Sequence, residues 1–186
     1  MYDACFRASK QKYLNMKKAI ILIGPGFEDS EFLYPFYRLQ EAGYAVDVAC
    51  WSDKPAAGKY GVPVTPTINL ENLKASDYEV VVVPGGHESP DRVRQIPKAL
   101  ALIRDMNKNG RIISSVCHGP WVLVSACVVK GRRITCYKGC RDDLINAGAL
   151  WIDEPVVTDG NLITAQHFRD NPEWMRQTLL ALQKID

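Results

Sequence analysis

The chain has 186 residues, of which 47% are hydrophobic and 24% charged, and its formal net charge is +2. These values are typical of a globular domain and exclude a largely disordered chain. The basic residues are spread along the sequence, and no apolar run approaches the ~18 residues that cross a bilayer. We therefore expect no nucleic acid partner and no membrane partner.

Short apolar runs alternate with amphipathic segments along the chain. The runs are typical of strands buried on both faces, and glycine follows most of the amphipathic segments, as it does after helices. The expected strands cover residues 18–24, 44–51, 78–83, 111–116 and 133–136. A hairpin or a loop excursion is expected within 53–70, and a hairpin within 156–164. The expected helices cover residues 29–42, 91–109, 119–129, 142–147 and 172–182. This alternation predicts an α/β fold, with a doubly wound, mostly parallel sheet sandwiched by helices.

The first fifteen residues differ in character from the rest. They contain several basic residues and no apolar stretch long enough for a signal peptide. We interpret residues 1–15 as an extension that is disordered or a non-native start, with Met16 as the natural start. Residues 16–186 are then expected to form a single domain.

The six cysteines do not resemble a disulfide framework. Several lie in or beside apolar core runs of a mid-sized domain, and no C-x-x-C motif occurs. Cys136 and Cys140 lack the further ligands that a structural zinc site needs. We expect a reduced, cytoplasmic protein that needs neither a metal ion nor a cofactor.

Cys117 is the sharpest candidate for a reactive group. It lies where an apolar strand turns directly into a helix, and the small residues Ser115 and Gly119 flank it. A nucleophile elbow has this arrangement, and a helix N-terminus lowers the pKa of a nearby thiol. The alternative is a small buried core residue. The following His118 favours the functional interpretation.

Two more strand ends carry candidate groups. Glu28 follows the first strand, where it either caps the next helix or shares a proton with Cys117. Gly85 and Gly86 follow a second strand, and their backbone N–H groups, with that of His118, are candidates for an oxyanion hole. Because parallel strands end at one edge of a sheet, these groups are expected to meet there.

In these segments the sequence resembles the ThiJ/PfpI family, its PfpI-like branch in particular, within the class I glutamine amidotransferase-like superfamily. The matching stretches are Gly26-Phe27-Glu28-Asp29-Ser30-Glu31, Pro84-Gly85-Gly86 with Pro90-Asp91-Arg92, Val116-Cys117-His118-Gly119-Pro120 and residues 141–148. The resemblance covers the chain from about Lys17 to its end. It implies a flavodoxin-like sandwich and a relation to DJ-1-like proteins.

The resemblance also implies roles for individual residues. Cys117 is the implied nucleophile, Glu28 its hydrogen-bonded acid and His118 the assisting base. An acid from a neighbouring subunit is implied to orient His118, and Asp91 matches it, with Glu88 as a rival. The site would then form at an interface of a homo-oligomer, either a dimer or a hexamer.

Further residues are expected at the pocket or its rim. They are His87, Tyr137 and His167. True amidotransferases have a His-x-Glu near the C-terminal helix, where this chain has Asn171-Pro172-Glu173. Ammonia transfer from glutamine is therefore not expected.

Three functions remain open from the sequence. The first is a glyoxalase III or deglycase-like enzyme of the stress response that converts methylglyoxal to lactate. The second is an intracellular cysteine peptidase or amidase, a hydrolase that uses the same Cys117 and His118. The third is a redox sensor or holdase that acts through oxidation of Cys117. The expected partner is accordingly a small carbonyl compound or a peptide substrate.

Overall fold

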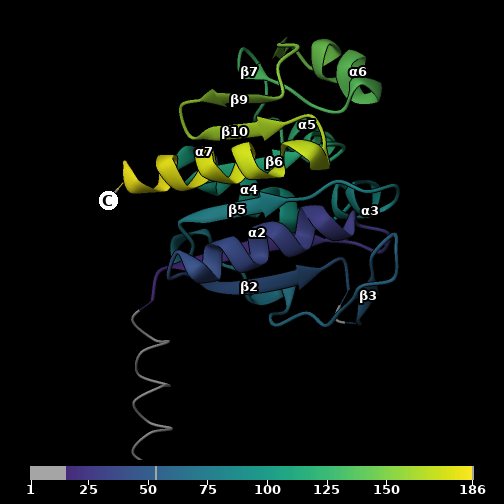
Figure 1. Cartoon of the computed structure of the whole chain (residues 1–186), viewed down its shortest axis with the longest axis vertical. Coiled ribbons are helices and arrows are strands. Elements are labelled where there is room, and N and C mark those ends of the chain that lie inside the picture. Colours follow the sequence, from purple (N-terminus) through teal and green to yellow (C-terminus); the bar gives the residue numbers. More distant parts are fainter. Residues whose placement is uncertain (1–15, 53, 186) are drawn as a thin grey trace, which may run out of the picture.

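In the computed structural model, which describes residues 16–52 and 54–185, a six-stranded sheet forms the middle layer (Figure 1). The strand order is β2-β1-β5-β6-β10-β9, and all neighbours are parallel except β10 and β9. The strands are β1 (Lys18–Ile23), β2 (Ala45–Cys50), β5 (Val80–Val83), β6 (Ile112–Val116), β9 (Val156–Asp159) and β10 (Leu162–Ala165). This arrangement confirms the predicted doubly wound, flavodoxin-like sandwich.

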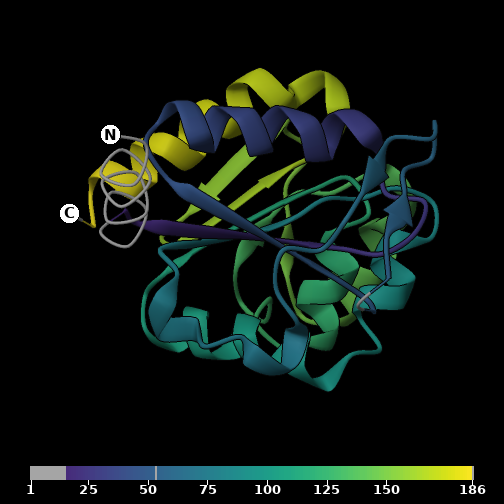
Figure 2. The same ribbon diagram turned by 90° about the horizontal axis from the view of Figure 1, so that it is seen from below.

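Helices cover both faces of the sheet (Figure 2). One face carries α2 (Asp29–Glu41) and α7 (Asn171–Gln183), and the other carries α3 (Ser89–Val93), α4 (Pro97–Lys108) and α5 (Pro120–Ser125). Alternate side chains of β1 point to opposite faces, so Ile20 packs with the α4 side and Ile21 with the α2 side. Burial on both faces explains why the strands are continuous apolar runs.

The helix predicted over residues 91–109 is two helices in the structure, α3 and α4. Ile96 is extended, with φ −98° and ψ 108°, and Pro97 begins α4. A proline disfavours helical geometry in the residue before it and supplies no N–H to a preceding turn, which explains the break.

The predicted helix over residues 119–129 ends early, at Ser125 of α5. Cys127 has a φ of 60°, the left-handed conformation that usually belongs to a glycine just after a helix. The helix therefore ends before Gly131, which the sequence analysis took as its stop.

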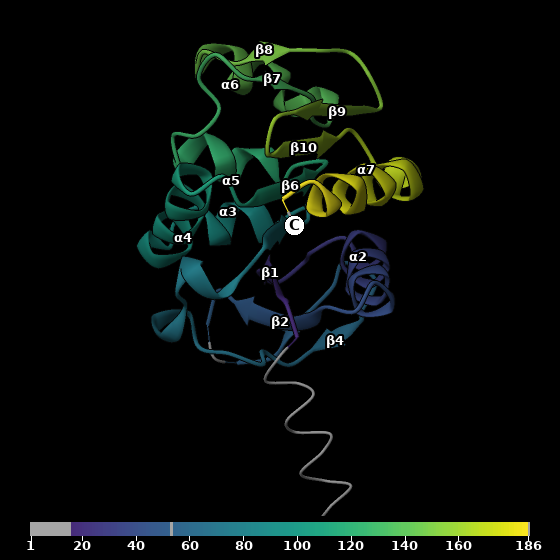
Figure 3. The same ribbon diagram turned by 90° about the vertical axis from the view of Figure 1, so that its left-hand side faces the viewer.

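The strand predicted over residues 133–136 lies outside the main sheet. Only β7 (Arg133–Ile134) is regular, and it pairs in parallel with β8 (Leu150–Trp151). This small sheet and α6 (Arg141–Asn146) lie beyond the β9 edge (Figure 3).

The glycine-rich segment after β2 forms a hairpin, one of the two forms expected there. Its strands β3 (Ala56–Ala57) and β4 (Pro63–Val64) are antiparallel, and the short helices η1 (Leu70–Asn72) and η2 (Ala75–Asp77) then lead to β5. Gly26 donates to the Ala57 carbonyl at 2.8 Å, and Lys59 donates to the Phe27 carbonyl at 2.8 Å. These bonds hold the hairpin over the end of β1.

Residues 1–15, predicted as an extension and including Cys5, lie outside the described residues. Within the part of the chain that the structure describes, no helix has the length and apolar character needed to span a bilayer.

Candidate active site

The ends of β1, β5, β6 and β10 meet at one edge of the sheet, because these strands are mutually parallel. A pocket of about 430 Å³ opens there. Its lining includes most of the residues predicted from the sequence: Glu28, Gly86, His87, Asp91, Cys117, His118, Tyr137 and His167. It also includes Glu31, Lys59, Trp121 and Phe168. Convergence of strand ends at a switch point is the common reason for a ligand site in such folds.

Cys117 directly follows β6 and has a φ of 61°, which is rare for a residue other than glycine. Its N–H donates to the Ala165 carbonyl at 3.0 Å, and its carbonyl accepts from Tyr137 at 2.9 Å. A Cβ at Gly119 would lie 2.2 Å from the Val83 carbonyl oxygen, so the elbow has room only for glycine there. Segments of the same chain that contact Cys117 therefore hold its unfavourable backbone conformation in place.

The acid beside the Cys117 thiol is Glu31, which the sequence analysis did not single out. Its Oε2 accepts a hydrogen bond from the Gly85 N–H at 2.8 Å, and the residue is fully buried. Burial, reinforced by the charge of Glu28, raises the pKa of Glu31 from 4.5 to about 8, against the hydrogen bonds from Gly85 and Cys117, which lower it. A neutral, proton-bearing carboxyl group is thus adjacent to the thiol at pH 7.

Glu28, expected to be the hydrogen-bonded partner of Cys117, has other neighbours in the structure. Its Oε2 lies 3.7 Å from Lys59 Nζ, and its Oε1 accepts from Ser30 Oγ at 3.4 Å. Glu28 precedes α2, whereas Glu31 lies on the helix face that also buries Pro35 and Leu39. Positions i, i+4 and i+8 share one face, so an acid at 31 in this apolar row was the missed signal.

The pKa of the Cys117 thiol is raised, contrary to the expectation of a lowered value. Burial is the main cause, the charge of Glu31 is the second, and the N–H of His118 acts in the opposite direction. Because α5 begins only at Pro120 and is short, its N-terminus does not outweigh burial. Cys117 and Glu31 therefore form a buried pair in which both groups hold their protons at pH 7, and the pair titrates as a unit.

His118 lies next to the thiol, with Nδ1 at 3.2 Å from Cys117 Sγ. Its ring stacks on Tyr137 at a centroid distance of 4.8 Å and meets Trp121 edge-on at 5.2 Å. Burial lowers the pKa of His118, and the charge of Asp91 partly offsets this effect. A neutral imidazole is able to accept a proton from the thiol or return one.

Asp91 is the acid on the His118 side of the pocket, and it comes from the same chain. Its rival Glu88 faces Arg92, with Oε1 at 2.8 Å from Nε and 2.7 Å from a terminal nitrogen. Glu88 is therefore engaged away from His118, as expected for two charged residues four apart on a helix.

The predicted oxyanion donors are not equivalent. The Gly85 N–H is occupied by Glu31, so it is not available to a substrate, which corrects the prediction for Gly85. Gly86 has a φ of 108°, and no acceptor for its N–H is found among the described residues. The N–H of His118 is directed to the Cys117 sulfur. Of the three predicted donors, Gly86 is therefore the one whose N–H is free for a substrate oxygen among the described residues.

Lys59 is the second pocket residue that the sequence analysis missed. It is delivered by the β3–β4 hairpin, whose position over the strand ends no local pattern reveals. Its ammonium group lies 3.7 Å from Glu28 Oε2, and its charge lowers the pKa of Glu31 and of His118.

Among the described residues, no group of three or more His, Cys, Asp and Glu side chains is placed to hold a metal ion. The described cysteines, Cys50, Cys117, Cys127, Cys136 and Cys140, are free thiols.

The fold and the site together define a flavodoxin-like protein with a cysteine elbow and an adjacent buried glutamate. Residues 17–181 match the DJ-1/PfpI family, and the chain belongs to this family.

Known relatives agree with this assignment over nearly the whole chain. A protein named deglycase PfpI from Pyrococcus furiosus is 40% identical over 166 residues, covering 89% of this chain and 99% of its own length. An uncharacterized protein from Archaeoglobus fulgidus is 44% identical over 167 residues, covering 90% of this chain and 99% of its own length.

A solved structure from Anabaena variabilis shares the fold. It is a two-domain protein with a DJ-1/ThiJ/PfpI-like domain and a ferritin-like domain, and it superposes with a TM-score of 0.87 at 33% identity. The match covers 90% of this chain and 48% of that one, so the chain spans about half the length of that protein.

Proposed function

We propose that this protein is a cysteine-dependent enzyme that acts on small 2-oxoaldehydes, such as methylglyoxal, and on their adducts with amines and thiols, as a deglycase does. The observation that carries the proposal is the Cys117 thiol, which interacts with both Glu31 and His118 inside a pocket. The name deglycase of the Pyrococcus furiosus relative supports this choice of substrate.

The reaction begins with proton-bearing Glu31 and Cys117 side chains and a neutral His118. His118 takes the thiol proton, so the negative charge lies on the sulfur, which adds to the aldehyde carbon. An S–C bond forms and the aldehyde oxygen takes the proton of Glu31, giving a hemithioacetal. The Gly86 N–H, for which no acceptor is found among the described residues, would bind this oxygen.

The remaining steps need no external oxidant. The hydrogen on the former aldehyde carbon moves to the ketone carbon, and the hydroxyl proton moves to the ketone oxygen. The first carbon is thereby oxidised, the second is reduced, and a thioester of lactate results. Water then breaks the S–C bond and releases lactate and the thiol. His118 moves protons in these steps, and Lys59 stabilises the negative charge that develops on oxygen. With an adduct as the substrate, the S–C bond to Cys117 forms as the C–N or C–S bond of the adduct breaks, and the amine or thiol leaves with the proton that His118 took from Cys117.

The test is lactate formation from methylglyoxal without added glutathione. We expect wild-type turnover of about 1 s⁻¹ or more, and loss of at least ~100-fold in Cys117→Ala and in Glu31→Ala. The matched control is Cys127→Ala, because Cys127 is an exposed cysteine outside the pocket. Wild-type protein without lactate formation would contradict the proposal.

A cysteine peptidase or amidase is the second candidate, and the 3.2 Å contact of Cys117 with His118 favours it. Fluorogenic peptides, tested on the same variants, distinguish the two. Cleavage that depends on Cys117 without lactate formation supports the peptidase. Absence of both activities, with a gain of two oxygens on Cys117 in mild peroxide, supports the redox sensor.

A further inference from the structure

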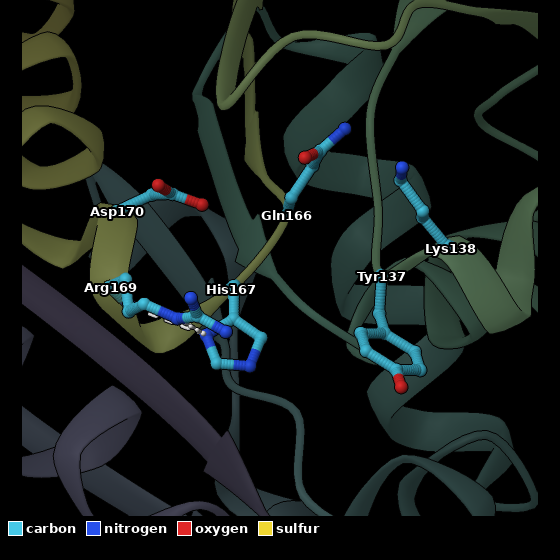
Figure 4. Close-up of a pocket in the computed structure, with 6 residues that line it drawn as sticks. All are labelled: Tyr137, Lys138, Gln166, His167, Arg169 and Asp170. Atoms are coloured by element: carbon cyan, nitrogen blue, oxygen red, sulfur yellow. Dashed lines mark hydrogen bonds between the residues drawn. The ribbon is translucent and has the colours of Figure 1, made fainter.

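Figure 4 shows the residues that line a second cavity, of about 390 Å³. Its lining residues are Tyr137, Lys138, Gln166, His167, Arg169 and Asp170. Tyr137 and His167 also line the catalytic pocket, and their ring centroids are 6.4 Å apart. The two cavities are thus adjacent, separated by the rings of Tyr137 and His167, and one molecule could extend into both.

The lining of this cavity carries more positive than negative charge. Among the described residues, neither Lys138 nor Arg169 forms an ion pair. Arg169 Nε only approaches His167 Nδ1, at 3.4 Å, so its terminal nitrogens are unoccupied in that part of the chain. Figure 4 shows the two cationic side chains on opposite sides of the cavity. Asp170 is the acid in the lining.

The other polar groups in the lining, Gln166 and His167, already have partners, so Lys138 and Arg169 are the main groups that could bind an anion in this cavity. Gln166 Nε2 donates to Asp153 Oδ1 at 2.8 Å, so it is already paired. His167 Nδ1 is close to both the N–H and the Nε of Arg169, which favours the neutral ring with its proton on Nε2. Burial together with Arg169 lowers the pKa of His167, which agrees with a neutral ring.

We propose that this cavity is a subsite for a carboxylate on the amine or thiol that carries the aldehyde. The inference rests on the proposed function, since it names the part of the adduct that lies beyond the reacting carbon. His118 lies at the thiol and Tyr137 stacks on His118, so the cavity begins about one ring beyond the reacting group. The lining has two positive side chains and one negative side chain, a net charge of +1. A ligand with one negative charge matches it, which favours a carboxylate over a phosphate monoester. The substrates are then adducts of free amino acids and of acidic peptides.

The test compares two adducts that differ in one charge. Methylglyoxal forms hemithioacetals with N-acetylcysteine, which has a carboxylate, and with N-acetylcysteine amide, which is neutral. We expect kcat/KM for lactate release to favour the carboxylate adduct by about tenfold, and the preference to weaken as salt is added.

Matched double variants connect the preference to the cavity. Lys138→Met/Arg169→Met should remove the preference, whereas Arg104→Met/Lys108→Met should retain it, because the latter pair is exposed on α4. Equal rates with both adducts in the wild type, or a preference that survives in the first double variant, would overturn the inference.

Binding measured without turnover separates this inference from the proposed function. Acetate and inorganic phosphate, titrated into ¹⁵N-labelled protein, are the probes. Acetate-induced shifts of the Lys138, Gln166 and Arg169 amides, absent from the Lys138→Met/Arg169→Met variant, support the carboxylate subsite even if no adduct is turned over. Shifts with phosphate alone, or with neither anion, overturn it.

Discussion

Glu31 is the residue whose protonation is most strongly coupled to the fold. It is a carboxyl group inside the protein, held by the Gly85 N–H on one oxygen and adjacent to the Cys117 thiol. A neutral carboxyl group at this position serves as proton donor, while a charged one would oppose formation of the thiolate. The same burial that makes Glu31 useful for catalysis therefore makes the stability of the protein depend on pH.

We expect Glu31→Gln to change this pH dependence. The folded-state pKa of Glu31 is raised to about 8, so its neutral form favours folding fully below the unfolded pKa of about 4.5, and the contribution is lost as pH rises towards 8. The free energy of unfolding of the wild type, minus that of the variant, should fall across this window by at most about 1.4 kcal/mol per pH unit. Urea unfolding from pH 4.5 to 8 measures it.

The control is Gln40→Ala, at an exposed position of α2. It adds and removes no ionisable group, so its stability difference from the wild type should not vary with pH. A constant difference between wild type and Glu31→Gln across the window would show that Glu31 is ionised throughout, and the proton-donor role would then be wrong.

At the scale of elements, the β3–β4 hairpin depends on one side chain of α2. The Asp29 carboxylate accepts hydrogen bonds from the Tyr60 and Val62 N–H groups, both at 2.9 Å. A Cβ at Gly58 would lie 2.6 Å from this carboxylate, so the turn fits around it closely. The anchored turn carries Lys59 into the pocket, and the element therefore supplies a charge to the site.

Asp29→Ala should destabilise the protein and displace Lys59. Two N–H groups would lose their acceptor, and we expect the free energy of unfolding to fall by about 2 kcal/mol. Asp105→Ala, an exposed acid on α4, should change it by no more than about 0.5 kcal/mol. Urea unfolding of both variants measures the difference. Equal stability of the two would mean that water replaces the carboxylate without cost.

At the scale of the whole molecule, the acid near His118 comes either from the same chain or from a neighbouring subunit of an oligomer. Similarity to PfpI-like proteins implies a dimer or hexamer in which a neighbouring subunit contributes it. The structure of one chain already has Asp91 in the pocket of its own His118, where its charge partly offsets the burial that lowers the histidine pKa. An acid from the same chain needs no partner, whereas one from another chain makes the enzyme an obligate oligomer.

Mixing inactive subunits distinguishes these arrangements. We expect a native mass above the 20.8 kDa of one chain, and no recovery of activity when Cys117→Ala and Asp91→Asn proteins are dissociated and reassembled together. Each pocket would still lack one of its own residues. Recovery towards a quarter of wild-type activity would instead show that Asp91 acts across an interface, and native mass spectrometry of the mixture verifies that mixed oligomers formed.

The sequence alone was sufficient for the sheet, its layers and the cysteine elbow. Continuous apolar runs that end in glycine or proline define strands buried on both faces, and parallel strands must end at one edge. Cys117, His118 and Gly86 could therefore be assigned to one pocket from the sequence, because each lies within three residues of the end of a strand.

Only the tertiary structure decided which groups face the thiol. Glu31 rather than Glu28 is its neighbour because the rotation of α2 about its axis turns position 31 towards the core. The Gly85 N–H is occupied by that carboxylate, and Lys59 arrives on a hairpin that folds back over β1. Strand ends are set by local patterns of hydrophobicity, whereas helix rotation and loop placement are set by packing between segments far apart in the sequence.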